Sequence, residues 1–484
     1  MKRRAAVLIA SCMMLTWSGI VHAQTWRPLR NQPRFSSPGT PLLLTDGTVM
    51  VQDSDASDWW RLTPDANGSY LNGTWTQLAS LPKGYGPLYY ASAVLADGRV
   101  IVEGGEYNLG NQQVETNLGA IYDPTTDKWT GVSPPTGWGD IGDAPSVVLP
   151  NGKFMIGHID DVQDALLDPK TMSWTVEPGT GKRDRNAEEG WTLLPGGTVL
   201  TVDALLAPGA EKFVPSLVKW ISAANTIVRL EDSFSQEIGP AVLRPDGTVF
   251  ATGANGNGAG HTSVYHPPAD RNKPGHWVPG PDFPGKLDIA DGPAALLPNG
   301  SVLCQASPGI YHPPSHFFEF DGTKLKAVPA PPNAPNDPSY AGRMLVLPTG
   351  QVLFTDGSTD VEIYTPTGSA DRAWAPTISS VPTQLTRGQT YVASGTQFNG
   401  LSQAVAYGDD AQAATNYPLV RIKNDTTGHV FYTRTHDHST MAVATGDKIV
   451  STNFDVPGSM ETGTGKLVVV SNGIASDPVA VTVQ

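Results

Sequence analysis

LLLTDGTVMV, residues 42–51, decides the fold, because the same pattern returns six more times along the chain. Each copy has an apolar run, a two-residue turn that ends in glycine, and a second apolar run. The later copies are AVLADGRVIV (93–102), VVLPNGKFMI (147–156), TLLPGGTVLT (192–201), AVLRPDGTVF (241–250), ALLPNGSVLC (295–304) and LVLPTGQVLF (345–354). Asp-Gly and Asn-Gly supply the positive φ angles that a tight hairpin needs. The pattern therefore predicts seven similar hairpins.

Two further strands follow each hairpin, so every repeat predicts a four-stranded unit of about fifty residues. The fourth strand usually carries a tryptophan, at Trp75, Trp129, Trp174, Trp220 and Trp277, with Leu325 in the sixth copy. The seventh copy has no obvious fourth strand of its own. Residues 25–29 offer one, which would close the ring, and Trp374 is a rival for that place. Residues 24–374 thus predict a seven-bladed kelch-type β-propeller.

The repeat stops near residue 375, and shorter alternating strands follow as far as residue 484. They are expected at 390–396, 404–408, 419–423, 430–435, 448–454, 466–471 and 478–483. Seven strands in such a length predict an immunoglobulin-like β-sandwich over residues 375–484. The fold class is therefore all-β, a propeller followed by a sandwich.

The first residues predict export. Basic residues 2–4 precede an apolar run, which is typical of a secretory signal peptide, here residues 1–23. A lipobox ending at Cys12 is the second interpretation, and it is disfavoured because residues 13–15 are apolar where a lipoprotein continues with a polar linker. We expect an exported monomer, with periplasm and medium left open.

Charge and apolar length exclude two classes of partner. The formal net charge is −14, which disfavours nucleic acid, since phosphate contacts need clustered basic residues. No segment after residue 23 is long and apolar enough to be expected to span a membrane. Cys304 is the only cysteine of the predicted mature chain, so no internal disulfide is expected.

Carboxylates recur at one position of the repeat. In a propeller, the segment that leads into each innermost strand lies at the central channel. Nine or ten residues before each turn glycine stand Ser37 or Pro38, Tyr89, Asp143, Glu188, Glu237, Asp291 and Tyr340. Four neighbouring acids repel one another unless they bind a cation, share protons, or accept hydrogen bonds from amides at the start of the strands. The sequence leaves these three roles open.

Aromatic and polar side chains are expected around this acidic ring. The loops that leave the second strands add Glu103, Tyr107 and His158 on the same face. Tyr90 and Trp138 are placed nearby. Carboxylates beside aromatic rings suit sugars, whose apolar faces stack while their hydroxyls hydrogen bond. We therefore treat these five residues as candidate contacts for a carbohydrate or small polyol.

Several short segments resemble those of one enzyme family. They are Gly86–Ser92 around Tyr89, Gly104–Tyr107, Ser339–Gly342 around Tyr340, Thr435–His436, and Ser37–Gly39. Together with the repeats they resemble the galactose oxidase and glyoxal oxidase family of copper-radical oxidases over nearly the whole mature chain. The resemblance implies a copper site with Tyr89, Tyr340 and His436 as ligands, Tyr107 as the stacking aromatic, and a loop of the C-terminal domain that reaches into the propeller.

The chain departs from that family at two site positions. Ser37 stands where the family has the cysteine that is bonded to a tyrosine, and Ala341 replaces a copper-binding histidine. Cys304 falls in a second strand, where we expect it to be buried. His438 or a ring carboxylate is a possible substitute ligand. The pairs Tyr265–His266 and Tyr311–His312 are placed in third strands, away from the channel.

Three functions follow as hypotheses. The first is an exported protein whose channel binds, and in one version processes, a carbohydrate or small polyol. Its catalytic candidates are Tyr89, Tyr340 and the four carboxylates. Oxygen ligands of this kind favour calcium or another hard divalent cation over copper. The second is a copper-dependent alcohol or aldehyde oxidase with an altered site. The third is a kelch interaction module without catalysis.

Overall fold

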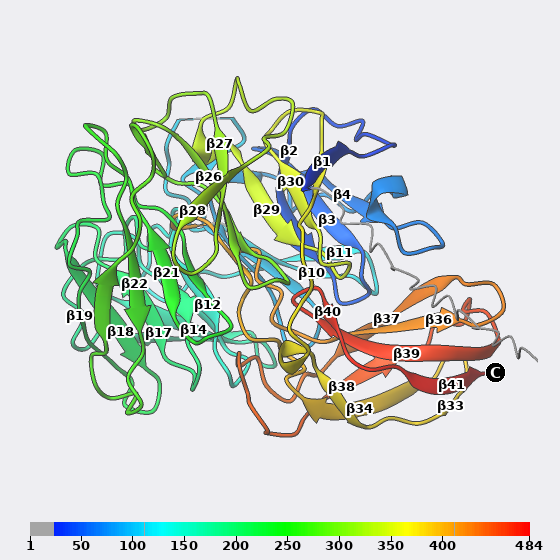
Figure 1. The fold of residues 1–484 in the computed structure, drawn as a ribbon. Helices are drawn as coiled ribbons and strands as arrows, with labels where there is room; N and C mark the ends of the chain where they lie inside the picture. The colour runs from blue at the N-terminus through cyan, green and yellow to red at the C-terminus, as the bar shows by residue number, and fades with distance from the viewer. Residues whose placement is uncertain (1–23, 111, 411) are drawn as a thin grey trace, which may run out of the picture.

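A computed structural model describes residues 24–110, 112–410 and 412–484. The predicted signal peptide and the lipobox at Cys12 lie outside the described residues. Six four-stranded sheets and one six-stranded sheet form a seven-bladed propeller, and a further curled sheet forms the C-terminal domain beside it (Figure 1). Within the described residues, no helix is long and apolar enough to cross a membrane.

The seven blades follow the seven sequence repeats, with the strands of each blade antiparallel. Blades one to three contain β2 (Pro38–Leu43), β3 (Val49–Asp53), β4 (Trp59–Thr63), β5 (Thr74–Gln77), β7 (Ala91–Val94), β8 (Val100–Glu103), β10 (Gly119–Asp123), β11 (Lys128–Val132), β12 (Ser146–Val148), β13 (Phe154–Gly157), β14 (Asp164–Asp168) and β15 (Ser173–Glu177). Blades four and five contain β16 (Thr192–Leu193), β17 (Val199–Val202), β18 (Gly209–Val214), β19 (Lys219–Asn225), β20 (Ala241–Leu243), β21 (Val249–Thr252), β22 (Thr262–His266) and β23 (His276–Pro279).

Blade six and blade seven complete the ring. They contain β25 (Ala294–Leu296), β26 (Val302–Pro308), β27 (His316–Phe320), β28 (Leu325–Val328), β29 (Arg343–Val346), β30 (Val352–Thr355), β31 (Glu362–Thr365) and β1 (Thr25–Pro28). β1 pairs with β31, so the N-terminal strand closes the ring. Trp374 lies instead in the short 3-10 turn η3 (Arg372–Trp374) and is not the closing residue. Ring closure removes the exposed sheet edges that an open array would have.

The hairpins between the first and second strands differ from the prediction in their turn. In blade one, Gly47 N–H donates to the Leu44 carbonyl (3.0 Å) and Leu44 N–H to the Thr48 carbonyl (2.7 Å). This is a three-residue loop, not the two-residue turn that was predicted. Its glycine has φ of 76° and lies where a type I turn needs a left-handed residue to return to the strand.

In the blades that have one, the tryptophan of the outermost strand joins the blade to the one before it. Trp129 Nε1 donates to the Ala79 carbonyl (3.0 Å), and Trp174 Nε1 to the Ser133 carbonyl (2.7 Å). Trp26 of β1 makes the same bond to Pro329 (2.6 Å) and so ties blade seven to blade six. These rings are therefore structural, as an aromatic with one polar edge at a packed interface usually is.

The C-terminal domain is one curled sheet around its own apolar core, consistent with the predicted sandwich. Its strands are β32 (Thr377–Ser380), β33 (Gln384–Leu385), β34 (Thr390–Thr396), β36 (Leu419–Asn424), β37 (Val430–His436), β38 (Val450–Asp455), β39 (Gly463–Ser471), β40 (Ile474–Ala475) and β41 (Val479–Val483). In Figure 1 these strands run from yellow-brown to red beside the blades. The strand predicted at 404–408 is the exception: β35 (Val405–Ala406) pairs with β25 of blade six.

Short elements complete the chain. They are β6 (Pro87–Leu88), which pairs with β9 (Tyr107–Asn108), β24 (Leu287–Asp288), which pairs with β26, and the 3-10 turns η1 (Tyr70–Asn72) and η2 (Ser339–Ala341). β6 and β9 place Tyr89 and Tyr107 at one end of blade two. The rings of these two tyrosines are 6.2 Å apart.

Candidate functional site

The predicted ring of residues lines one cavity of about 590 Å³. Six of the seven blades each contribute one residue from the segment that leads into their innermost strand. These residues are Tyr89, Asp143, Glu188, Glu237, Asp291 and Tyr340. The remaining lining residues are Asp55, Leu88, Glu106, Tyr107, Gly110, Tyr311 and Asp409. Counting back from the turn glycines thus located the cavity, because the repeat places equivalent residues at the same height in each blade.

Three ring residues have a backbone conformation that non-glycine residues rarely adopt. The φ angle is 51° at Tyr89, 60° at Glu188 and 48° at Asp291. Such conformations cost on the order of 1–3 kcal/mol each and cluster at functional sites. In blade one the equivalent residue, Ser37, does not line the cavity, and its backbone N–H donates instead to Asp53 (2.8 Å).

A loop of the C-terminal domain enters the propeller and forms part of the cavity. The described part of the loop that precedes residue 411 is residues 403–410, and Gln403 Oε1 accepts a hydrogen bond from Leu193 N–H of blade four (2.7 Å). Asp410 Oδ2 accepts another from Tyr90 N–H of blade two (2.9 Å). The resemblance to the copper-radical oxidases implied such a loop at Thr435–His436. The structure assigns it to a different segment, whose side chain in the cavity is a carboxylate, Asp409.

Glycine allows this loop to approach closely. A Cβ atom on Gly408 would lie 2.2 Å from Asp291 Oδ1, and a Cβ atom on Gly190 would lie 2.3 Å from the Gly408 carbonyl oxygen. Both distances are far below van der Waals contact. Gly408 therefore fixes the position of Asp409 next to the ring acids.

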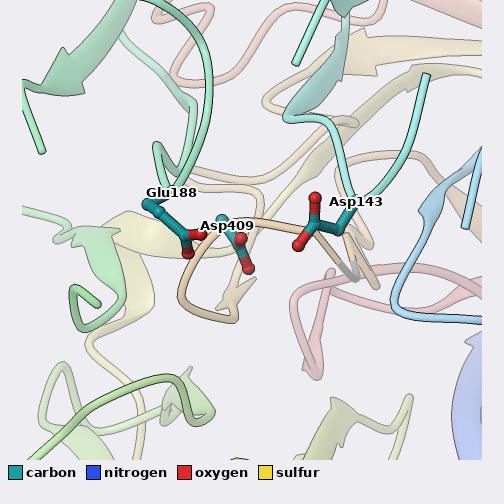
Figure 2. A group of neighbouring side chains, drawn as sticks. All are labelled: Asp143, Glu188 and Asp409. Carbon is teal, nitrogen blue, oxygen red and sulfur yellow. The ribbon is translucent and has the colours of Figure 1, made fainter. Parts of the chain in front are cut away.

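Asp409 and the ring acids form two overlapping triads. Asp143, Glu188 and Asp409 each place one carboxylate oxygen within 4.8 Å of the others, as do Glu188, Glu237 and Asp291. Figure 2 shows the first triad, in which the three carboxyl groups converge from two propeller loops and the C-terminal loop. Glu188 belongs to both triads, so the five acids make one cluster, which we call the carboxylate cage.

Burial and mutual repulsion raise the pKa of every cage carboxyl. Desolvation is the largest cause for Asp143 and Glu188, followed for Asp143 by the Glu188 charge and for Glu188 by the Asp291 charge. The pKa values of Glu237, Asp291 and Asp409 are raised for the same reasons. The cage thus holds protons at neutral pH or takes up a cation that neutralises it.

The cage acids are not used to hold the start of the strands. One oxygen each of Asp143, Glu237 and Asp291 is buried with no hydrogen-bond partner among the described residues. Of the three roles that the sequence left open, bonding to backbone amides is therefore the one that this geometry disfavours, since buried polar atoms are normally paired.

Arg343 lies beside the cage but is bound elsewhere. Its guanidinium lies 3.8 Å from the centre of the Tyr407 ring and 5.4 Å from that of Tyr89. It also donates to the carbonyl oxygens of Tyr340 (2.7 Å) and Gly342 (2.9 Å). No basic residue is among the described residues that line the cavity.

Tyr311 corrects the sequence prediction. It was placed in a third strand, away from the channel, but it lies in the loop between β26 and β27 and lines the cavity. Its hydroxyl donates to Glu237 Oε1, and its ring lies 5.6 Å from that of Tyr340. With Tyr89, Tyr107 and Tyr340 it gives the cavity four tyrosines. Tyr265–His266, by contrast, lies in the third strand β22 as predicted.

Four of the predicted substrate contacts do not line the cavity. Tyr90 is 1% exposed and its hydroxyl donates to Gln52 Oε1 (2.7 Å). Glu103 is completely buried in β8. Trp138 packs edge-on against His158 with 4.7 Å between ring centres. Neighbouring positions along the chain alternate between cavity and core, so proximity in sequence to Tyr89 or to the acids did not place these side chains in the cavity.

His436 and His438 are not brought to the two tyrosines. Thr435 N–H donates to the Thr45 carbonyl and His438 N–H to the Ala96 carbonyl, and both acceptors belong to hairpin turns. Those turns are at the opposite ends of the inner strands from Tyr89. His436 instead contacts Asp437 (2.7 Å) and Asp455 (3.2 Å). The predicted metal ligation by these histidines together with Tyr89 and Tyr340 is therefore wrong.

The two remaining reactive groups, His438 and Cys304, are buried away from the cavity. His438 is buried, its Nδ1 lies 2.9 Å from Thr452 Oγ1, and burial lowers its pKa to about 3. Cys304 is completely buried in β26, as predicted, and burial raises the pKa of its thiol. Neither group is available to ligands in the cavity.

Comparison with known proteins supports the fold. No protein-family model matches the chain. A 90-residue stretch is 31% identical to the kelch-like protein TerF of Aspergillus terreus, and it covers 18% of this chain and 19% of that relative. The chain thus matches about a fifth of the length of that curated relative.

Among solved structures, a fungal alcohol oxidase of the AA5 family, in complex with copper, is similar with a TM-score of 0.53. The two chains are 13% identical, and the match covers 96% of this chain and all of the oxidase. A virginiamycin B lyase of Staphylococcus aureus matches 70% of this chain and 98% of its own, at 9% identity and a TM-score of 0.49. The chain therefore resembles the galactose oxidase family in its fold.

Proposed function

We propose that this is an exported protein whose channel cavity binds a carbohydrate or small polyol. The observation that carries the proposal is the lining of the cavity: the carboxylate cage faces four tyrosines across about 590 Å³. Specific ligand cavities are commonly of this size and combine aromatic surface with a few polar groups. Carboxylates accept hydrogen bonds from hydroxyl groups, and tyrosine rings contact the apolar faces of sugars.

Copper-radical chemistry is not part of this proposal, because the residues present do not fit it. The described lining contains no histidine and no cysteine. Copper favours imidazole and sulfur ligands, whereas carboxylates favour hard cations. Of the ligands that the family resemblance implied, only Tyr89 and Tyr340 are among the described residues that line the cavity. We interpret the site as a degenerate form of the copper-radical site on a retained scaffold.

The cage also has the chemistry for processing a bound sugar. Asp143 and Glu188 are close, and the charge of Glu188 raises the pKa of Asp143. A protonated carboxyl beside an ionised one is suited to general acid–base catalysis. Any hydrolase or lyase activity is therefore expected to depend on this pair, and Asp143→Asn and Glu188→Gln test that dependence.

Ligand binding tests the proposal directly. We would measure binding of neutral sugars and polyols by calorimetry and ligand-observed NMR to wild type, Tyr107→Ala, Asp143→Asn and, as a matched control, His436→Ala. We expect affinity to fall about tenfold or more in the two cavity variants and to stay unchanged in the control. Absence of binding to every sugar and polyol, or equal affinity in all four proteins, contradicts the proposal. Peroxide release from alcohols after copper loading would favour the oxidase instead.

A further inference from the structure

The carboxylate cage has the composition of a site for a hard cation. Its five acids come from four blades and the C-terminal loop, and Glu188 belongs to both triads. Carboxylate oxygens are the preferred ligands of Ca²⁺, which takes six to eight oxygens in flexible geometry. Acid clusters are common on protein surfaces without any ion, so composition alone does not make a site.

A second observation points to a missing partner. Glu237 is 8% exposed, and its Oε2 is buried with no hydrogen-bond partner among the described residues. Its Oε1 accepts from the Tyr311 hydroxyl, which holds the carboxyl group toward Glu188 and Asp291. A buried carboxylate oxygen without a partner costs free energy unless something else satisfies it. Glu237 is thus aimed into the cage, and its Oε2 has no N–H or O–H donor among the described residues unless it shares a proton with Asp291.

The protein supplies part of the counter-charge, because the Arg343 charge acts on Asp291 and opposes the rise in its pKa. Arg343, the basic side chain placed beside the cage, is held by the Tyr407 ring and by two backbone carbonyl oxygens. Among described residues, no lysine, arginine or histidine lines the cavity. Hydroxyl groups of a neutral sugar do not neutralise five acids, so bound protons or a cation must do so, and a cation can also contact the sugar hydroxyls.

We propose that the carboxylate cage binds a hard divalent cation of the Ca²⁺ type, with Glu188 as the shared ligand and with the open side of the cation turned toward the cavity. There the hydroxyl oxygens of the bound polyol complete its coordination. The ligand-bridging part of this inference rests on the proposed function, and the cation site itself does not. The proposed site has only oxygen ligands, whereas the copper site that the family resemblance implied includes imidazole ligands.

The cation is tested first without sugar. Chelator-treated protein is titrated with CaCl₂, MgCl₂ and CuSO₄ by calorimetry, and its melting temperature is followed. We expect a Ca²⁺ Kd on the order of 10⁻⁵–10⁻³ M and a melting temperature raised by about 2–4 °C or more. Glu188→Gln and, should that variant fold poorly, Glu237→Gln are expected to weaken Ca²⁺ binding about tenfold or more. Asp203→Asn, in a separate acid cluster, is the matched control and keeps wild-type binding.

Two outcomes overturn the cation site. One is no heat and no melting shift with either Ca²⁺ or Mg²⁺, and the other is binding that persists in both cage variants but is lost in Asp203→Asn. Sugar binding is then measured with Ca²⁺ and with chelator. Ca²⁺ binding without any sugar binding contradicts the proposed function and leaves the cation site standing. Sugar binding of equal affinity in chelator contradicts the bridging role alone.

Discussion

Two clusters of buried acids in this protein have opposite surroundings. In blade four, Lys182 Nζ lies 2.8 Å from Glu189 and 3.3 Å from Glu211, and all three side chains are buried. Backbone N–H groups of Arg183 and Asp184 also donate to Glu211. In the channel, no lysine lines the cavity among the described residues, and the backbone donor to the carboxylate cage is Asp410 N–H, which bonds Asp409 Oδ1 (2.8 Å). One cluster is completed by the protein, and the other is left open toward a cavity.

The different surroundings indicate different roles for buried acids: a structural role in blade four and a ligand-binding role in the carboxylate cage. Both clusters have carboxyl groups whose pKa values are raised, chiefly by desolvation, so the raised pKa does not distinguish them. The partners do. In blade four the unpaired exception is Oδ1 of Asp203, whereas in the cage Asp143, Glu237 and Asp291 each retain a buried oxygen without a partner. Removing charge from the two clusters is therefore expected to change stability in opposite directions.

The largest effect is expected at Lys182. Lys182→Met removes the buried cation from Glu189 and Glu211 and leaves two carboxylates facing each other. Breaking a buried ion pair in this way costs about 3–5 kcal/mol. Urea unfolding at pH 7.5 measures the loss, with the exposed Lys170→Met as control. A loss no larger than that of the control would mean that blade four does not depend on its ion pair.

A smaller effect is expected where the C-terminal loop meets the cage. Gly408→Ala places a Cβ atom 2.2 Å from Asp291 Oδ1, so the loop must shift and carry Asp409 with it. We expect a stability loss of about 1–3 kcal/mol, typical of overpacking, together with loss of cation binding. Gly458→Ala is the control, because no heavy atom lies within 4 Å of its Cβ position. Wild-type Ca²⁺ affinity in Gly408→Ala would show that Asp409 is not a ligand.

Sequence reasoning located the ring because the repeat fixes geometry. Once the hairpin glycines are aligned, every residue nine or ten places earlier falls at the start of an innermost strand, and six of the seven predicted positions line the cavity. The same regularity predicted the blade order. Local periodicity is thus sufficient where the fold repeats itself.

Local periodicity was not sufficient to predict the parts of the site that lie outside the repeat. The segment 404–408 alternates like a sandwich strand, yet it docks on blade six and delivers Asp409, because packing against another domain decides its partner. The only local signal is the run Gly408-Asp409-Asp410, which does not say which domain it enters. For His436 the error was the opposite one, because a residue predicted to be in the site lies outside it. Its Thr-His pair matched the family by residue type but lies at the hairpin turns.

Two matched acid-to-amide substitutions test whether loss of one charge changes stability in opposite directions in the two clusters. Asp291→Asn removes one charge from the cage, and Glu189→Gln makes the same chemical change in blade four. Without divalent cations at pH 7.5, we expect Asp291→Asn to leave stability unchanged or to raise it by up to about 1 kcal/mol, since repulsion is relieved. Glu189→Gln is expected to lower stability, because Lys182 loses its closest partner. Losses of equal size in both variants would contradict the assignment of different roles.

The last effect concerns a buried acid outside both clusters, Glu362 of β31. Desolvation and then the Asp360 charge raise its pKa to about 9, and the side chain is completely buried. The folded state therefore holds a proton that the unfolded state releases between about pH 4.5 and pH 9, so this group lowers stability as pH rises through that window. Glu362→Gln keeps the shape and removes the titration.

We expect the melting temperature of the wild type to fall by about 2–4 °C more than that of Glu362→Gln between pH 5 and pH 8.5. Because the cage acids titrate equally in both proteins, the difference between the two melting curves isolates Glu362. Glu177→Gln, at the end of the edge strand β15, is the control and should follow the wild type. Parallel pH profiles for wild type and Glu362→Gln would mean that Glu362 is ionised in the folded protein. Burial without a counter-charge would then not be enough to hold a proton in this propeller, and the argument from raised pKa values in the cage would weaken with it.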